Sequence, residues 1–561
     1  MSRWQHTFLL LTALLLSSAS VCFLADATAT SPDVHHCSFD DVMYKKGVQN
    51  IIKIVPKQGE ESIQPYLVST DDEWGTIRIN VSMKDLQSES KYCKKGDAEK
   101  RETRPDFLGG NLPCTKEAEI TPEKMKNLTD VIIPEAVKLH AQRLEVVHVK
   151  EPFKVPDFTN DDSVCKYFTV PEDHKESGVP NADMVLYVAA GPGKTFAAPC
   201  ATAEDGRPVV AAMNFAYFNL TNVRVYTRFA AHEIAHALGF SFYQMNKLNM
   251  TRATKNVERK VYAVVVSSTR TKEEAQKHYN CTTIDGMELE DEDTAKGTVL
   301  SHWKMRNAKD ELMSTRQMAS AGLYTVLTLS TFHDMGFYRA KFDMAESMTW
   351  GSNIGCSLMD GMCVNESDTI DSWTKKKWKV PNFPSLFCDT VRHRFPCTTD
   401  RLGVGTCEPE ENKWWTQPEG CPVVVPYFDS LDSNTYISGI CADESAKPTM
   451  GSIKGSDAWC VDGKDLRYKY SFDDISVRLD SVCAKIKCED NQVKVKYLGN
   501  ESNWILCPEN QYITLVSANF TAESQIKCPK YSEVCTMAPN GSSLVVPQPA
   551  KEKEPKEEID D

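Results

Sequence analysis

Two short apolar runs and one amphipathic stretch characterise the first half of the chain. Residues 182–190 (ADMVLYVAA) and 208–216 (PVVAAMNFA) are apolar almost throughout, which is typical of strands buried inside a mixed sheet. Residues 121–147 instead repeat apolar side chains at intervals of three and four, the spacing of an amphipathic helix. The pattern therefore predicts an α+β fold.

Another helical stretch contains the residues with the clearest chemistry. In AHEIAHALGF, His232 and His236 are four positions apart, so that on a helix both imidazoles lie on one face and can reach one metal ion. The intervening Glu233 points beside the ion, where it can act as a base toward water. The alternative interpretation is a buried helix with two hydrogen-bonded histidines. We expect Gly239 to end this helix with a positive φ angle.

A catalytic zinc site usually takes three protein ligands, so a third ligand must be found. Residues 239–242 lack the histidine that the compact metzincin pattern places there. Downstream, His302 is followed eleven residues later by Met313, as in a methionine turn beneath a three-histidine site. The rival ligand is Glu258, 22 residues after His236, which would complete a thermolysin-like site with two histidines and one glutamate. Spacing alone leaves both possibilities open.

The N-terminal residues indicate the compartment. Residues 1–27 combine Arg3, an apolar run and small residues in an Ala25-x-Ala27 pattern, which is typical of a cleaved secretory signal. Sequons for N-glycosylation support the same compartment because they are used only in the secretory pathway. The nine predicted glycosylation sites are Asn80, Asn127, Asn219, Asn249, Asn280, Asn365, Asn500, Asn519 and Asn540. We therefore expect a secreted or extracellular protein.

Length and charge narrow the class of protein further. A chain of 561 residues is expected to form two to four domains. A formal net charge of −14 argues against a nucleic-acid partner. We expect no transmembrane segment after the signal, because no later segment is apolar for eighteen residues. The charged residues 541–561 are predicted to be a disordered tail, and they show no apolar signal for a lipid anchor.

The cysteines suggest one special thiol. Of 20 cysteines, Cys22 is removed with the signal, which leaves an odd number in an oxidising compartment. Cys37, in VHHCSFDD, lies far from its next neighbour and is the candidate for the unpaired thiol. Thirteen cysteines lie from residue 356 onward, which predicts a disulfide-rich C-terminal domain. Nearness in sequence suggests the pairs Cys93–Cys114, Cys165–Cys200 and Cys281–Cys356, the last of which links the two regions.

Several motifs together resemble one known family. HEIAHALGF, SHWKMRNAKDELM, AGLYTVLTLSTFHDMGFY, WGSNIGC and CPVVVPY resemble leishmanolysin, the major surface metalloprotease family of kinetoplastid parasites. The resemblance runs from about Trp74 to Cys535 and implies a metzincin with a long insertion before the third histidine. It implies one zinc ion per chain, Glu233 as the catalytic base and Met313 as the methionine of the turn. The implied zinc ligands are His232, His236 and His302.

The resemblance also implies the domain organisation. The expected parts are a signal peptide (1–27), a pro-segment (28–70), an N-terminal catalytic domain with a mixed sheet and the active-site helix (71–240), a central domain with the third ligand (241–355) and a Cys-rich domain (356–540). Cys37 would then be a latency switch, since a thiolate in the pro-segment can occupy the fourth zinc position. The alternatives are an intermolecular thiol, or His35 or His36 in its place. Many family members end in a lipid-anchor signal, which is not seen here.

The leading functional hypothesis is a secreted or cell-surface zinc metalloendopeptidase, made as a latent precursor. Its substrates would be proteins and peptides, such as host or parasite surface proteins, hydrolysed by zinc-activated water with Glu233 as general base. One alternative is a non-catalytic adhesion or complement-binding surface protein on the same scaffold. Another is a thermolysin-like peptidase that uses Glu258.

Overall fold

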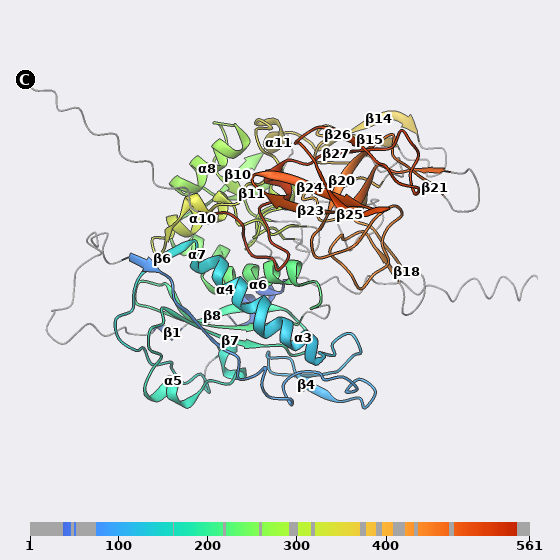
Figure 1. Cartoon of the computed structure of the whole chain (residues 1–561). Helices are drawn as coiled ribbons and strands as arrows, with labels where there is room; N and C mark the ends of the chain where they lie inside the picture. The colour runs from blue at the N-terminus through green and yellow to red at the C-terminus, as the bar shows by residue number, and fades with distance from the viewer. Residues whose placement is uncertain are drawn as a thin grey trace, which may run out of the picture.

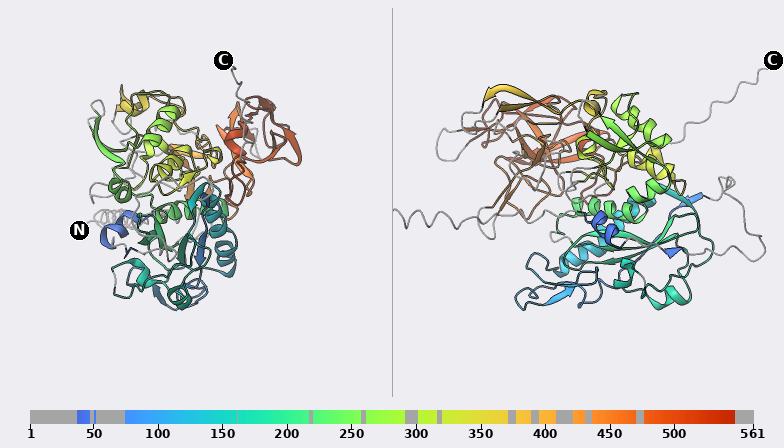
Figure 2. Two further views of the ribbon diagram at one scale, coloured as in Figure 1. Left: turned by 90° about the vertical axis from the view of Figure 1, so that its left-hand side faces the viewer. Right: turned by 180° about the vertical axis from the view of Figure 1, so that it is seen from behind.

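The protein folds around a central helix that lies between two layers of other elements. Helix α6 (Val223–Ala237) has the N-terminal sheet on one side and the central and C-terminal elements on the other in all views of the ribbon (Figures 1 and 2). The computed structural model describes residues 37–46, 50–51, 74–160, 162–216, 220–256, 261–290, 301–315, 320–370, 377–388, 395–407, 421–430, 436–469 and 476–546. The predicted signal peptide, His35, His36, Asn219 and Glu258 lie outside these residues.

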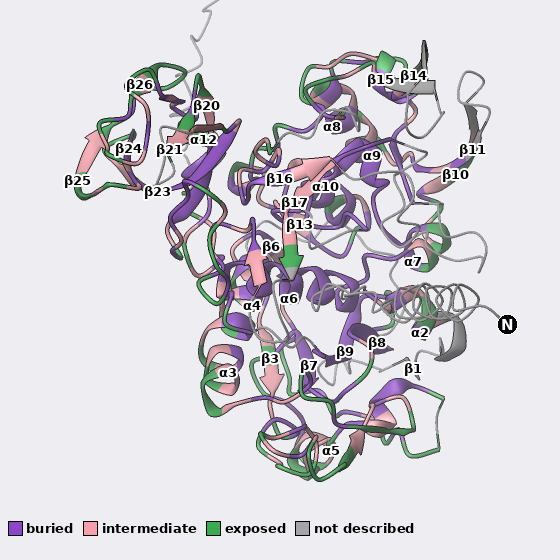
Figure 3. Ribbon diagram, turned by 90° about the vertical axis from the view of Figure 1, so that its right-hand side faces the viewer, coloured by how far each residue is buried: buried purple, intermediate pink, exposed green. Residues whose placement is uncertain are grey.

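The N-terminal sheet has five strands in the order β1-β8-β9-β7-β3. Its pairs are parallel except for β8 with β9, so the sheet is mixed, as the sequence predicts. The strands are β1 (Asn50–Ile51), β8 (Phe196–Thr202), β9 (Pro208–Asn214), β7 (Met184–Ala189) and β3 (Ile79–Ser82). The middle strands β7, β8 and β9 are buried along their whole length (Figure 3), which explains why they carry no polar alternation.

The two faces of this sheet pack in different cores. Along β7, Met184, Leu186 and Val188 belong to the large core that includes helix α6, and the alternate residues belong to a smaller core on the other face. This division follows the two-residue period of a strand. Helices α3 (Pro122–Asn127) and α4 (Ile133–Ala141), joined by a π-helical turn (Leu128–Ile132), form the stretch predicted to be helical, which continues into strand β6 (Leu144–Val147).

Helix α6 ends at a glycine. Leu238 is its C-cap, and Gly239 has φ of +106°. The Phe240 amide donates to the Ala235 carbonyl and the Gly239 amide to the His236 carbonyl, both at 3.0 Å, which is the Schellman arrangement that closes many helices. The predicted positive φ angle is therefore confirmed, and the chain turns away directly after His236.

The central residues add helices around α6 and share its core. They include α7 (Phe242–Lys247), α8 (Thr269–Tyr279), α9 (Met305–Ala308), α10 (Val326–Asp334) and the three-stranded sheet of β10 (Thr251–Asn256), β11 (Val261–Val266) and β12 (Met287–Glu288). A small sheet joins β13 (Arg339–Ala340), β6 and β2 (Trp74–Thr76). One hydrophobic cluster extends from Ile77 to Val423, so it crosses the predicted boundary at residue 240. The domain boundaries remain predictions.

The C-terminal residues form an antiparallel sheet in the order β25-β24-β23-β20-β27-β26. Its strands are β25 (Asn500–Leu506), β24 (Gln492–Tyr497), β23 (Ser481–Glu489), β20 (Ala458–Lys464), β27 (Gln525–Lys527) and β26 (Tyr512–Thr514). Residues 541–546 are also ordered, since the Leu544 amide donates to the Thr536 carbonyl at 2.8 Å. The disordered tail proposed for residues 541–561 stays a prediction, because residues 547–561 lie outside the described part.

Short elements complete the description. They are α2 (Phe39–Lys46), β4 (Thr103–Pro105), β5 (Asn111–Pro113), the 3-10 turn Val164–Tyr167, α5 (Glu172–Glu176), the 3-10 turn Phe342–Met344, α11 (Ser357–Asp360), β14 (Val364–Ile370), β15 (Lys377–Pro381), β16 (Gly405–Cys407), β17 (Val424–Pro426), β18 (Phe428–Ser430), β19 (Tyr436–Ser438), β21 (Arg467–Lys469), β22 (Ser476–Arg478) and α12 (Tyr531–Val534). Among the described helices, none has the length and apolar character needed to cross a bilayer.

Candidate metal centre

Three histidines from two distant parts of the sequence meet at helix α6. His232 and His236 lie one turn apart on α6, and His302 lies just before α9. The Nε2 atom of His236 is 3.1 Å from that of His232 and 3.2 Å from that of His302. All three side chains are buried. The structure therefore brings together the three histidines that were candidate ligands in the sequence.

Hydrogen bonds fix the tautomers of the two helical histidines. Nδ1 of His232 donates to the Leu312 carbonyl and Nδ1 of His236 to the Phe240 carbonyl, both at 2.7 Å. Because a carbonyl can only accept, the proton sits on Nδ1 and the neutral ring keeps a free lone pair on Nε2. Burial, and then the neighbouring His232 and His302, hold the pKa of His236 well below its usual value. Unprotonated nitrogens therefore converge on one buried point.

This arrangement fits a tetrahedral metal ion. Zinc–nitrogen bonds of ~2.1 Å at tetrahedral angles would place ligand nitrogens ~3.4 Å apart, close to the two separations found here. A fourth donor is present, because the ligand atoms of Cys37, His232, His236 and His302 all lie within 4.8 Å of one another. Facing lone pairs repel one another unless a cation lies between them. The residues therefore fit zinc, for which thiolate and imidazole are the usual ligands.

The segment around Cys37 lies directly against the histidines. Cys37 forms a parallel bridge with Thr195, just before β8. Phe39 stacks on the ring of His236, with centroids 4.2 Å apart and planes inclined by 4°, and Asp40 Oδ2 is 3.4 Å from His302 Nδ1. Burial, followed by the nearby Glu233 carboxylate, raises the pKa of the Cys37 thiol when no metal is present. Cys37 is the free cysteine of the described residues.

Glu233 lies in the same site but outside the ligand cluster. It is fully buried, and no described residue donates a hydrogen bond of normal geometry to either carboxylate oxygen. Burial raises its pKa to about 8, although the Cys37 thiol and the Ala197 backbone offset part of the rise. A fully buried carboxyl group with a raised pKa is costly to the fold and is typical of functional sites.

Met313 lies in the turn that supports the histidines. It is buried, and its neighbour Leu312 supplies the carbonyl that holds His232. The Met313 carbonyl accepts from the Trp303 amide at 2.8 Å, next to His302. The turn therefore contacts both histidine segments.

The other predicted positions are distributed around this centre. The structure joins Cys93 to Cys114, Cys165 to Cys200 and Cys281 to Cys356, the same partners that nearness in sequence suggests. Six further bridges lie in the C-terminal part. The described sequon asparagines are never buried: Asn80, Asn249, Asn280 and Asn365 are exposed, and Asn127, Asn500, Asn519 and Asn540 are half-buried.

Two groups of residues near the centre were not found by sequence reasoning. One is the pair Phe39 and Asp40, which follow Cys37 on α2. The other is Glu311, whose carboxylate accepts from the Met313 amide at 2.6 Å. The sequence does show an acidic residue near Cys37 and another before Met313. It does not show which side chains these acids contact, because those contacts form only in the folded chain.

Comparisons with known proteins agree with this geometry. The sequence profile of the leishmanolysin family matches residues 35–541. Leishmanolysin of Leishmania chagasi is 35% identical over 82% of this chain and 77% of its own length, and that of Leishmania major is 33% identical over 83% and 77%. A leishmanolysin-like peptidase of Drosophila melanogaster is 24% identical over 51% of this chain and 54% of its own. This chain belongs to the leishmanolysin family of metallopeptidases.

Proposed function

We propose that this chain is a zinc metalloendopeptidase that is made as a latent precursor and holds one zinc ion through His232, His236 and His302. The observation that carries the proposal is the convergence of the three Nε2 atoms of these histidines beside the buried Glu233. In His232 and His236 the Nδ1 proton is donated to a carbonyl, which leaves Nε2 free to bind a metal. A bound zinc ion supplies a Lewis acid that polarises the scissile carbonyl and acidifies water.

The chain's own residues perform the proton transfers. In the ionised form, the Glu233 carboxylate takes a proton from the attacking water, because it lies beside the histidine nitrogens without being one of the ligands. The same carboxyl group then delivers this proton to the departing amine nitrogen. The bonds from His232 and His236 to carbonyls keep both rings in place during the reaction.

Latency is assigned to the segment that begins at Cys37. Its thiolate would fill the fourth ligand position, while Phe39 covers the His236 ring. Residues further along the segment, in β1, pair in parallel with β8 and so cover the edge of the sheet. While the thiolate holds this segment at the metal, neither water nor a substrate can take the fourth position, so release of Cys37 is required for activity.

We assign the protein to the secretory pathway, with N-linked glycans on some of the predicted asparagines. Support comes from the signal-like N-terminus and from the sequons, whose described asparagines are all at least partly accessible. The nine disulfides among the described residues also favour an oxidising compartment. Substrates are proteins and peptides, with surface proteins of a host or of the producing cell as the first candidates. A non-catalytic adhesion protein would not need a fully buried carboxyl group beside the three histidines.

The metal assignment is tested by zinc analysis of the purified chain and of single variants. Wild type is expected to hold one zinc ion, His302→Ala to lose it, and Glu258→Ala to keep it. The reverse result for the two variants would establish the thermolysin-like site and overturn the assignment. A wild-type protein that neither binds zinc nor hydrolyses casein would support the adhesion alternative.

Latency is tested by comparing the uncleaved forms of wild type and Cys37→Ala in a peptide-hydrolysis assay. The variant is expected to be active without cleavage, because the fourth ligand position is open to water. Mercurial reagents that capture thiols should activate uncleaved wild type and leave the variant unchanged. Equal, low activity of both uncleaved proteins would show that the segment blocks the site sterically and that Cys37 is not the switch.

A further inference from the structure

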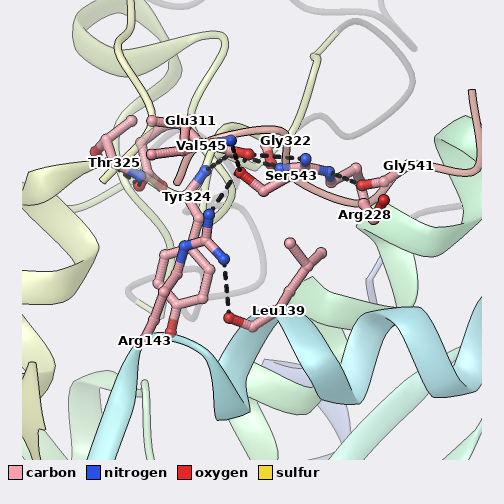
Figure 4. A network of polar contacts seen from close by, with 12 residues as sticks. Leu139, Arg143, Arg228, Glu311, Gly322, Tyr324, Thr325, Gly541, Ser543 and Val545 are labelled. Atoms are coloured by element: carbon pink, nitrogen blue, oxygen red, sulfur yellow. Dashed lines mark hydrogen bonds and ion pairs between the residues drawn. The ribbon is translucent and has the colours of Figure 1, made fainter. Parts of the chain in front are cut away.

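We propose that Glu311 is a positioning residue of the metal centre, which fixes the turn around Met313 and thereby orients both His232 and His302. The inference rests on the proposed zinc site, and it assigns a role to a buried carboxylate that the proposed reaction does not use. Glu311 is 1% exposed and lies beside Thr325 in the close-up of the polar network (Figure 4).

The Glu311 carboxylate collects four hydrogen bonds. Oε2 accepts from the Met313 amide at 2.6 Å. Oε1 accepts from the Thr325 amide at 3.3 Å, the Thr325 hydroxyl at 3.0 Å and the Thr328 hydroxyl at 2.7 Å. One side chain therefore ties the turn to the start of helix α10, because Thr325 is the N-cap of that helix.

The first link runs from this turn to His232. Leu312 lies between Glu311 and Met313, and its carbonyl accepts from Nδ1 of His232 at 2.7 Å. The Leu312 amide donates to the Leu323 carbonyl at 2.8 Å, so the peptide is held from both sides. A shift of the turn would move the acceptor that sets both the tautomer and the direction of the His232 ring.

The second link runs to His302 through its neighbour Trp303. The Trp303 amide donates to the Met313 carbonyl at 2.8 Å. The indole Nε1 of Trp303 donates to the Thr328 hydroxyl at 2.9 Å, and that hydroxyl donates in turn to Glu311. The residue after the third histidine is thus fixed at its backbone and at its side chain, and both contacts lead back to the Glu311 carboxylate.

Only a carboxylate satisfies this set of donors. A glutamine at this position has one acceptor oxygen and a donor NH2 group. If its oxygen faces the Met313 amide, its NH2 group faces the Thr325 amide, and two donors then meet. The isosteric change Glu311→Gln therefore disturbs the turn without creating a cavity, which separates positioning from simple packing.

The test measures zinc affinity of the full chain by competition with a chelator, together with the absorption spectrum of the cobalt-substituted protein. Glu311→Gln is expected to weaken zinc binding by roughly 10- to 100-fold, the range for residues that orient metal ligands, and to alter the cobalt spectrum. Asp334→Asn is the matched control, because Asp334 also accepts from two backbone amides and from hydroxyl groups, at the start of α8. It should lower thermal stability and leave zinc affinity unchanged.

Thr328→Val is the second variant, since it removes one donor to Glu311 and the contact with Trp303 while it preserves side-chain volume. It keeps the test decisive if Glu311→Gln does not fold, and it is expected to weaken zinc binding several-fold. If wild type binds zinc and both folded variants bind it equally well, the positioning role is wrong and the metal assignment stands. If wild type itself binds no zinc at the histidines, the proposed function fails first.

Discussion

Replacement of Glu346 by glutamine should destabilise the fold strongly and in a pH-dependent way. Its carboxylate is buried and accepts from Arg228 Nη1 and Nη2 at 2.5 and 2.9 Å, and from the Tyr324 amide at 2.8 Å. Arg143 Nη2 lies 3.6 Å away. Arg228 Nε also donates to the Gly541 carbonyl at 2.6 Å (Figure 4), so Arg228 connects helix α6 with the C-terminal residues.

The magnitude follows from the pKa of Glu346. Burial raises this pKa, but the attraction and hydrogen bonds of Arg228, with Arg143, outweigh it and lower the pKa from 4.5 to about 2. At 1.36 kcal/mol per pKa unit, the ionised carboxylate contributes about 3 kcal/mol to the free energy of unfolding. Because the folded-state pKa is depressed, this contribution is complete above pH 4.5 and is lost as the pH falls toward 2. Glu346→Gln leaves two buried guanidinium groups, which costs about 3–5 kcal/mol at neutral pH.

Urea unfolding followed by tryptophan fluorescence provides the measurement, with wild type and Glu346→Gln compared at pH 7 and pH 3. The difference in unfolding free energy should be about 2 kcal/mol smaller at pH 3, because part of the wild-type carboxylate is then protonated in the unfolded state. Glu489→Gln serves as control, since Glu489 pairs with Lys487 and Lys494 at the surface, and it should change little at either pH. If the difference in unfolding free energy between wild type and Glu346→Gln were the same at both pH values, the ionised carboxylate would not be the cause of the stabilisation.

Three further outcomes are expected. Glu233→Gln should keep the zinc content and lower peptide hydrolysis by at least roughly 10²; near-normal activity would exclude Glu233 as the base. Gly541→Val should lower the thermal midpoint, because Gly541 has φ of +81° and an added Cβ would come within 2.6 Å of the Arg224 carbonyl oxygen; an unchanged midpoint would show that residues 541–546 do not stabilise α6. Replacing both Cys281 and Cys356 by serine should cost about 4 kcal/mol of unfolding free energy, as expected for a loop closed over a sequence separation of 75; a loss below 1 kcal/mol would contradict this estimate.

Features of the site that depend only on neighbouring residues could be predicted from the sequence. The i, i+4 spacing of His232 and His236 on a helix that ends at Gly239 needs no information from elsewhere in the chain, and both are found. The buried strands β7 and β9 were predicted from their apolar runs for the same reason. The α+β class and the family resemblance are confirmed.

Non-local contacts were beyond the sequence. Spacing could not choose between His302 and Glu258, because a ligand that arrives after a long insertion is positioned by tertiary packing. Strand β8 was not predicted, since its sequence FAAPCAT is rich in small residues and contains a proline, and its register shifts after Pro199. The composition of residues 541–546 gives no hint that Gly541 contacts α6, so this contact too could be seen only in the fold.

Helix α6 depends on residues from the whole chain, which bears on the predicted domain boundary at residue 240. His232 is held by Leu312, and Arg228 is held by Glu346 and Gly541. None of these three partners belongs to residues 71–240. The core around α6 also extends to Val423, so a fragment ending at residue 240 would expose apolar faces that the later elements cover. Two of the three histidines and Glu233 come from one helix, but the third histidine and the contacts that hold all of them come from later parts of the chain.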